Sequence, residues 1–184
     1  MINHFDALQI IKNRLQAVDW DALYEAELPR VYNYFLYKVC NRELAEDLTA
    51  TTFERAWKIR SRYNPLLASP ATWLFGIARN VLREDLRRNK AAEEKLEPIL
   101  DNQQWPATID VEEIFQEKQD KAFLQSLLLQ LPEREHDLIA LKYGAGLTNR
   151  EIAKTSGLSE SNVGSILHRS VASLQRKWNE RHER

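Results

Sequence analysis

Apolar residues recur at helical spacing through the first half of the chain. The segments 20–40, 41–59 and 71–88 each carry such a series. Asn41 stands before the second segment and is a residue type that caps helix N-termini. Asn-Pro and Ser-Pro pairs within 64–70 indicate a loop. The pattern predicts a bundle of three helices in this half.

Two more helices are predicted in the second half before its most specific motif. Apolar residues cluster at 123–131 and again at 138–143. Pro132 lies between the two clusters and is followed by two glutamates, which suits the first turn of a helix. We therefore expect an all-α protein, with no β-sheet in either half.

Residues 147–170 fit a helix-turn-helix. Thr148 and Glu151 have the spacing of a capping box, and Gly157 stands where the tight turn needs a positive φ. Ser159 is the expected cap of the second helix, and a plain helical hairpin is the alternative. In a helix-turn-helix the second helix enters the major groove of DNA. The side chains expected to face the duplex are Arg150, Glu160, Ser161, Asn162, Ser165, His168 and Arg169.

Charged residues are unevenly distributed along the 184-residue chain, although its 26 basic and 27 acidic side chains nearly cancel. Residues 91–120 hold nine acidic and two basic side chains, a net charge of −7. Pro98 and Pro106 interrupt any continuous helix there. The flanking blocks are mildly basic, which favours nucleic acid as a partner. The predicted organisation is an N-terminal helical extension at 1–19, a domain at 20–90, a flexible acidic linker at 91–117 and a domain at 118–184.

Composition argues against several functional classes. The single cysteine, Cys40, permits neither an intrachain disulfide nor a cysteine-based zinc site. The spacing of Glu133 and His136 occurs once, whereas di-iron bundles need two such pairs. No nucleophile elbow, Walker loop, membrane-length apolar run or signal peptide is recognisable. We expect a soluble cytoplasmic protein with no catalysis, no cofactor or metal, no small-molecule substrate and no membrane insertion.

The third predicted helix carries a row of cations. Arg79, Arg83 and Arg87 are spaced four apart and stack along one side, with Asn80 beside them. Guanidinium and amide groups suit a nucleic-acid backbone and base edges. An ordinary solvated helix face is the alternative interpretation of this row.

Three stretches in this order resemble the sigma-70 family of bacterial sigma factors, in its extracytoplasmic-function (ECF) type. Residues 45–57 resemble the helix that binds core RNA polymerase, and residues 72–85 resemble the promoter-melting helix. Residues 131–135, followed by 147–153 and the turn, resemble the domain that reads the minus-35 element. The resemblance covers about residues 20–180.

The resemblance implies that the two domains bind different parts of the polymerase and of the promoter. The first domain would dock on the polymerase clamp, and the second would sit on the flap. The implied clamp-binding residues are Asp47, Leu48, Phe53, Arg55 and Trp57. Core packing is an alternative role for Leu48, Phe53 and Trp57. The implied minus-10 residues are Arg62, Tyr63, Arg79, Asn80, Arg83 and Arg87, and the helix-turn-helix set above would read the minus-35 element.

The resemblance also implies partners and leaves choices open. Promoter DNA, core polymerase and an anti-sigma factor are the expected partners. The acidic linker would either thread the RNA channel of the polymerase or serve as a solvated tether. Ala50 replaces a glutamine that is usual in the clamp helix. The main alternative function is a helix-turn-helix repressor or activator with a helical sensor or dimerisation domain, and a helical adaptor is another.

Overall fold

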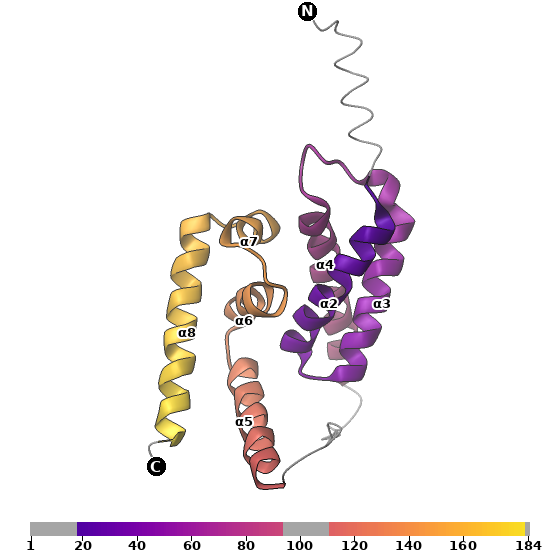
Figure 1. Ribbon diagram of the computed structural model, residues 1–184. Coiled ribbons are helices and arrows are strands. Elements are labelled where there is room, and N and C mark those ends of the chain that lie inside the picture. The colour runs from indigo at the N-terminus through magenta and orange to yellow at the C-terminus, as the bar shows by residue number, and fades with distance from the viewer. Residues whose placement is uncertain (1–17, 94–110, 183–184) are drawn as a thin grey trace, which may run out of the picture.

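A computed structural model describes residues 18–93 and 111–182, and these residues fold entirely into helices, turns and loops (Figure 1). The all-α prediction is confirmed for this part of the chain. None of its helices is both long and apolar enough to cross a membrane. The elements are α2 (Trp20–Val39), α3 (Arg42–Ile59), η1 (Arg60–Arg62), α4 (Pro70–Glu93), α5 (Val111–Leu129), α6 (Glu133–Ile139), η2 (Ala140–Gly144), α7 (Asn149–Ser156) and α8 (Glu160–His182).

The helices of the first half begin at local signals. The Oδ1 atom of Asn41 accepts from the backbone N–H of Leu44 at 2.9 Å, as the sequence predicts. Ser69 accepts from the N–H of Thr72 and so caps α4, whose first residue is Pro70. Helix α4 runs five residues past its predicted end at residue 88.

Cys40 closes α2 in a left-handed conformation with φ 51°, where glycine is the usual residue. Its backbone N–H donates to the carbonyl of Leu36 at 2.9 Å, which satisfies the helix end. The side chain is half-buried, so Cys40 is a helix-terminating residue rather than the simple core thiol that the sequence suggests.

The predicted extension at 1–19 and acidic linker at 91–117 fall largely outside the described residues. Helix α5 begins at Val111, which lies within the range predicted as linker. The helical content expected at the start of the second domain therefore begins earlier than residue 118.

The two halves pack against each other around a continuous apolar cluster. Val31, Phe35 and Phe75 contribute from the first half, and Leu138 and Leu141 contribute from the second. Helix α2 lies against η2, and α4 lies against α7, while α8 occupies the far side of the second half (Figure 1). The sequence predicts two domains on a tether, and the structure adds an extensive contact between them.

Gly144 lets the backbones of the two halves approach closely. A Cβ atom at this position would lie 2.9 Å from the carbonyl oxygen of Asn33 in α2, closer than real Cβ contacts. Glycine is therefore required here for space rather than for a special backbone angle.

Candidate nucleic-acid interface

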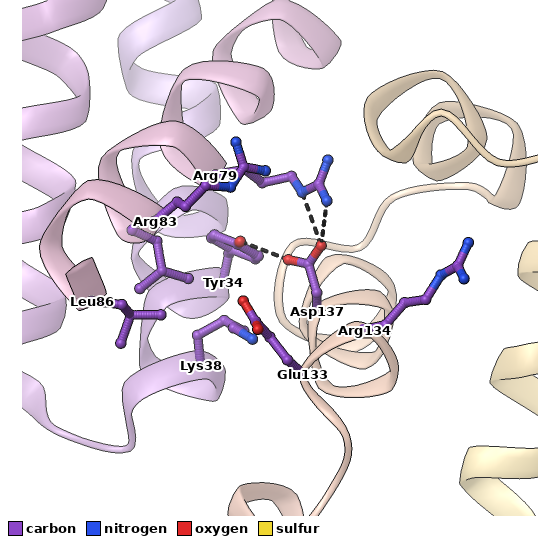
Figure 2. Close-up of a pocket in the computed structure, with 9 residues that line it drawn as sticks. Tyr34, Lys38, Arg79, Arg83, Leu86, Glu133, Arg134 and Asp137 are labelled. Atoms are coloured by element: carbon purple, nitrogen blue, oxygen red, sulfur yellow. Dashed lines mark hydrogen bonds and ion pairs between the residues drawn. The ribbon is translucent and has the colours of Figure 1, made fainter. Parts of the chain in front are cut away.

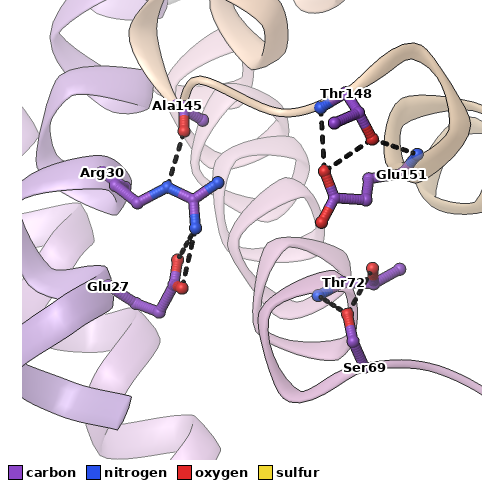
Figure 3. Close-up of polar contacts among 7 residues, drawn as sticks. All are labelled: Glu27, Arg30, Ser69, Thr72, Ala145, Thr148 and Glu151. Atoms are coloured by element: carbon purple, nitrogen blue, oxygen red, sulfur yellow. Dashed lines mark hydrogen bonds and ion pairs between the residues drawn. The ribbon is translucent and has the colours of Figure 1, made fainter. Parts of the chain in front are cut away.

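The helix-turn-helix is formed by α7 and α8, as predicted. Thr148 and Glu151 make the capping box: the Thr148 N–H donates to the Glu151 carboxylate at 2.8 Å, and the Glu151 N–H donates to Thr148 Oγ1 at 3.3 Å (Figure 3). Gly157 adopts φ 74° at the turn. Val163 and Ile166 are buried and hold α8 against the rest of the domain.

The predicted duplex-reading side chains share one property, which is exposure to solvent. They come from the first turns of α8 and from the start of α7, and they are Arg150, Glu160, Ser161, Asn162, Ser165, His168 and Arg169. Arg169 is steadied by a hydrogen bond from its Nε to the carbonyl of Ser165, at 3.3 Å. This face is available to a duplex without any rearrangement.

The cationic row on α4 is divided between solvent and protein. Asn80, Arg83 and Arg87 are exposed, and Asn80 Oδ1 accepts from the Arg83 guanidinium at 3.1 Å. Arg79 is different, because its side chain is 20% exposed and forms an ion pair of 2.7 Å with Asp137 of α6. The structure thus brings the predicted row together but commits one of its members to the other half of the molecule.

The loop that carries the predicted minus-10 residues Arg62 and Tyr63 is anchored by aromatic rings. Tyr63 packs edge-to-face against Trp73 and Trp20, with ring centroids 5.4 and 6.0 Å apart. Its hydroxyl donates to the carbonyl of Ala68 at 2.9 Å, and partial burial raises the pKa of this phenol. Tyr63 therefore shapes the loop, and the neighbouring Arg62 is exposed.

Two leucines at the tip of this loop were not selected from the sequence. Leu66 and Leu67 are 77% and 79% exposed, the highest values among the large apolar residues noted for their exposure. The sequence does contain a signal for these residues. The two leucines lie between the Asn-Pro and Ser-Pro pairs, outside any helical pattern that would place them in the core. An apolar loop tip beside cations suits contact with unstacked bases.

The predicted polymerase-binding residues on α3 separate into surface and core. Asp47 is exposed, and Trp57 is 54% exposed, with the Arg60 guanidinium 3.9 Å from its ring centroid. Leu48 is 3% exposed and packs in the core, so its contribution is to position the helix.

Phe53 and Arg55 have contacts within the first domain. Phe53 is half-buried against Tyr24, with ring centroids 4.8 Å apart, and lines an apolar groove between α2 and α3. Arg55 makes a two-pronged contact with Glu84 of α4, at 2.9 and 2.8 Å, which holds the two helices together. Ala50 lines the same groove, so the small residue at this position widens it.

Comparison with known proteins decides the family. Residues 23–92 match the family model described as Sigma-70 region 2, and residues 124–174 match the one described as Sigma-70, region 4. The chain belongs to the sigma-70 family. The matched ranges fall on α2–α4 and on α5–α8, so the two halves of the fold are sigma region 2 and sigma region 4.

Two curated relatives indicate the type of sigma factor, and one solved structure shares the fold. The chain is 25% identical over 171 residues to the ECF RNA polymerase sigma factor RpoE of Cereibacter sphaeroides, covering 92% of this chain and 90% of that protein. It is 27% identical over 165 residues to the ECF RNA polymerase sigma factor SigM of Bacillus subtilis, covering 86% and 94%. The fold is similar to that of sigma factor RpoE, solved in complex with the anti-sigma factor NepR from Bartonella quintana (TM-score 0.64, 19% identity, covering 86% and 95%).

The resemblance to ECF sigma factors is thereby confirmed. Such proteins are non-enzymatic initiation factors that direct RNA polymerase to promoters and start transcription there. A repressor or activator with a separate sensor domain is not favoured, because both halves of the chain match sigma regions.

The one metal-like spacing in this sigma factor has a structural use. His136 is buried, and its Nε2 donates to the carbonyl of Tyr37 at 2.7 Å, which joins region 4 to region 2. Burial, with a smaller effect from Lys38, lowers the pKa of His136. Within the described residues, no group of three or more histidine, cysteine or acidic side chains is placed to hold a metal ion.

Proposed function

We propose that this sigma factor uses three separate surfaces during initiation: one for core polymerase, one for the minus-10 element and one for the minus-35 element. The observation that carries the proposal is the fully capped helix-turn-helix with an exposed recognition face, joined to a region 2 whose cationic helix lies elsewhere on the molecule. The protein would carry no catalytic activity of its own and would act in the cytoplasm.

The polymerase-binding surface is proposed to lie on α3 and its groove with α2. Asp47, Trp57 and Phe53 are the side chains on this surface that a partner can reach. An exposed tryptophan beside an apolar groove is the kind of anchor that dominates binding energy at interfaces. Leu48 and Arg55 are proposed to support the surface from behind.

The minus-10 surface is proposed to combine α4 with the loop that follows η1. Arg79, Arg83 and Arg87 would hold the phosphates of the captured strand, and Asn80 would contact a base edge. Arg62, Tyr63 and the leucine tip would shape the site for an unstacked base.

The minus-35 surface is proposed to be the exposed start of α8. Asn162 is suited to adenine, Arg169 to guanine or phosphate, and Glu160 to the amino group of cytosine. Arg150, Ser161, Ser165 and His168 flank these side chains and are proposed to fix the helix against the backbone.

An anti-sigma factor is proposed as a further partner. The sigma factor RpoE with a similar fold was solved in complex with the anti-sigma factor NepR. A partner of this class would act by covering the polymerase-binding surface on α3. Most of the acidic segment between the two regions lies outside the described residues, and both its proposed roles, channel insertion and tethering, remain predictions.

Run-off transcription tests the proposal. Purified bacterial core polymerase and a genomic promoter library are mixed with the wild-type chain, with Trp57→Ala, or with Leu129→Ala as a control that removes another exposed apolar side chain. The proposal predicts start-site-selective transcripts for the wild type and the control, and a loss of at least about tenfold for Trp57→Ala, the scale of an interface hot spot. Absence of selective transcripts with the wild type would refute the proposal.

A further inference from the structure

Region 4 covers part of the proposed minus-10 surface of region 2. Two nitrogens of the Arg79 guanidinium, Nε and NH2, lie 2.9 and 2.7 Å from Oδ2 of Asp137 (Figure 2). A third nitrogen donates to the carbonyl of Thr155 at the end of α7. Carbonyls at a helix C-terminus attract cations. The Arg79 side chain is thus held at two points by region 4.

The Asp137 carboxylate offers Arg79 negatively charged oxygen acceptors, as a nucleic-acid phosphate would. Arginine binds carboxylates and phosphates with the same fork of donors. The other carboxylate oxygen, Oδ1, accepts from the hydroxyl of Tyr34 at 2.9 Å, which fixes the carboxylate in place. Tyr34 is fully buried, and burial together with Asp137 raises its pKa, so it remains a donor.

Other contacts besides this ion pair join region 4 to region 2. We call the arrangement in which the two regions are in contact the closed form. Arg30 is held by Glu27 at 2.8 and 2.9 Å, and its Nε donates to the carbonyl of Ala145 in region 4 at 2.8 Å (Figure 3). Gly144 packs against the backbone of α2 near Asn33. These contacts lie around the apolar cluster shared by the two regions.

Geometry prevents this closed form from engaging both promoter elements at once. The names of the minus-35 and minus-10 elements place them about 25 base pairs apart, which is about 85 Å at about 3.4 Å per base pair. Helix α8, with 23 residues, spans about 35 Å at 1.5 Å per residue. Regions held together by the Arg79–Asp137 ion pair and by hydrogen bonds cannot bridge the distance between the elements, so they must separate before both are bound.

We propose that region 4 acts as an internal competitor for the strand-capturing surface, with Asp137 occupying the position of a DNA phosphate on Arg79. In the free chain the duplex-reading face of α8 is open, and Arg79 becomes available only when the regions separate. The inference rests on the proposed role of α4 in binding the minus-10 strand.

Single-stranded DNA binding tests the competition directly, since phosphate contacts need no particular sequence. The probe is a short fluorescein-labelled oligothymidine, and binding is measured by anisotropy over a range of salt concentrations. Asp137→Asn removes the competing charge and keeps the shape of the side chain. Asp21→Asn is the matched control, because it removes one negative charge from an exposed position on α2.

The charge variant should bind the probe more tightly than the wild type by roughly 3- to 10-fold, the scale of one typical net hydrogen bond. Its salt dependence should rise by about one phosphate contact. Adding Arg79→Ala to Asp137→Asn should abolish the gain, and Asp21→Asn should bind more tightly by much less than Asp137→Asn.

A variant that forces the regions apart by steric clash distinguishes the effect of separating the regions from the effect of removing a charge. Gly144→Ala leaves Arg79 and Asp137 intact, but its methyl group would collide with the α2 backbone, so the regions must part. It should also increase probe binding. Gly164→Ala is the control, because a Cβ there meets only an ordinary contact of 3.5 Å with the Asn149 side chain. Circular dichroism and thermal unfolding verify that each variant remains folded.

The proposal is overturned if folded Asp137→Asn and Gly144→Ala bind the probe no better than the wild type, or if no variant binds it. Either result would leave intact the role in initiation, which run-off transcription measures with core polymerase. Conversely, tighter binding by both variants together with inactivity of the wild type in transcription would support the internal contact and refute the proposed function.

Discussion

The two proposed DNA-binding faces of this sigma factor differ in their accessibility, although both are built on amphipathic helices. The α8 face consists of exposed side chains on the outer side of region 4. The α4 face is divided, because Arg79 is engaged by Asp137 while Arg83 and Arg87 are exposed. If the proposed roles hold, the duplex-reading face is preformed, whereas the strand-capturing face depends on the relative position of the two regions.

The difference arises from which helices form the contact between the regions. Region 4 packs on region 2 through α5, η2 and α7, and α6 adds the side-chain contacts of His136 and Asp137. All of these elements precede the recognition helix. Region 2 contributes α2 and α4, and α4 is the helix that carries its cationic row. We therefore expect the chain to contact duplex DNA before it holds the melted strand.

The largest effect should come from removing the exposed part of the α4 face. The double substitution Asn80→Ala with Arg83→Ala removes a base-edge contact and a phosphate contact. We expect at least about a tenfold loss of open-complex formation, since the base-edge contact contributes about 1–3 kcal/mol and the loss of the phosphate contact adds to it. Permanganate footprinting of melted promoter DNA measures this step.

Binding to promoter DNA that is still double-stranded should be unchanged in that double variant, because α8 is untouched. Arg88→Ala is the control, since it removes a neighbouring exposed cation of α4. An equal loss of binding to the double-stranded promoter and of promoter melting would contradict the assignment of the α4 face to strand capture.

The next largest effect should fall on the opposite face alone. Arg169→Ala should weaken binding to minus-35 duplex DNA by about 1–3 kcal/mol and relax base preference at one position. Arg176→Ala removes an exposed cation further along α8 and should have a much smaller effect. Titration of a labelled duplex by anisotropy gives both values. If Arg169→Ala instead impaired oligothymidine binding and left duplex binding intact, the two faces would have been assigned the wrong way round.

A smaller effect is expected from loosening the helix-turn-helix without changing its surface. Thr148→Ala removes the side-chain cap of α7 and should lower the free energy of unfolding of region 4 by about 1 kcal/mol. Chemical denaturation measures the change. Thr51→Ala, in the middle of α3, is the comparison, and it should not reproduce the loss. An unchanged stability for Thr148→Ala would show that the capping box contributes nothing.

The smallest effect should be a pH dependence of the contact between the regions. His136 faces the Tyr37 carbonyl and Lys38 from α2, and Asp137 from its own helix. Burial lowers its pKa in the closed form, while an exposed histidine keeps a pKa of about 6.5. The contribution of His136 to closure is therefore fully present above that value and is lost as the pH falls through the lowered pKa.

Energy transfer between dyes on the two regions can follow this opening. Glu43→Cys in α3 and Arg176→Cys in α8 are exposed positions for the dyes, and Cys40→Gly removes the native thiol where glycine suits the left-handed backbone. Transfer should decrease in mild acid, and His136→Gln should reduce this response. His168→Gln, at an exposed histidine, is the control. Transfer that increased in acid would contradict the assigned role of His136.

Local features of this fold could be predicted from the sequence because their causes are local. Asn41, Thr148 and Gly157 each act within a few residues, through a cap or a turn, and the structure confirms all three. The exposed start of α8 also follows from helical periodicity. The same reasoning distinguishes poorly between Leu48 and Trp57, because an amphipathic pattern does not show which large apolar residues lie at the edge of the core.

The contact between the regions could not be predicted in this way. Arg79 and Asp137 are separated by 58 positions in the chain, and each has a satisfactory interpretation as a solvated helix residue. The role of Gly144 is likewise invisible without the neighbouring backbone of α2. Pairings of this kind depend on how two separately folded units meet, which no periodicity within either unit encodes.

We infer that the free chain is closed and that its two regions separate in the initiating complex, which the same dye pair on α3 and α8 can measure. Energy transfer is recorded for the free protein and again after core polymerase is added in excess. High transfer in the free protein and a large decrease on binding are predicted. Low transfer in the free protein, or high transfer that persists in a transcriptionally active complex, would contradict the claim.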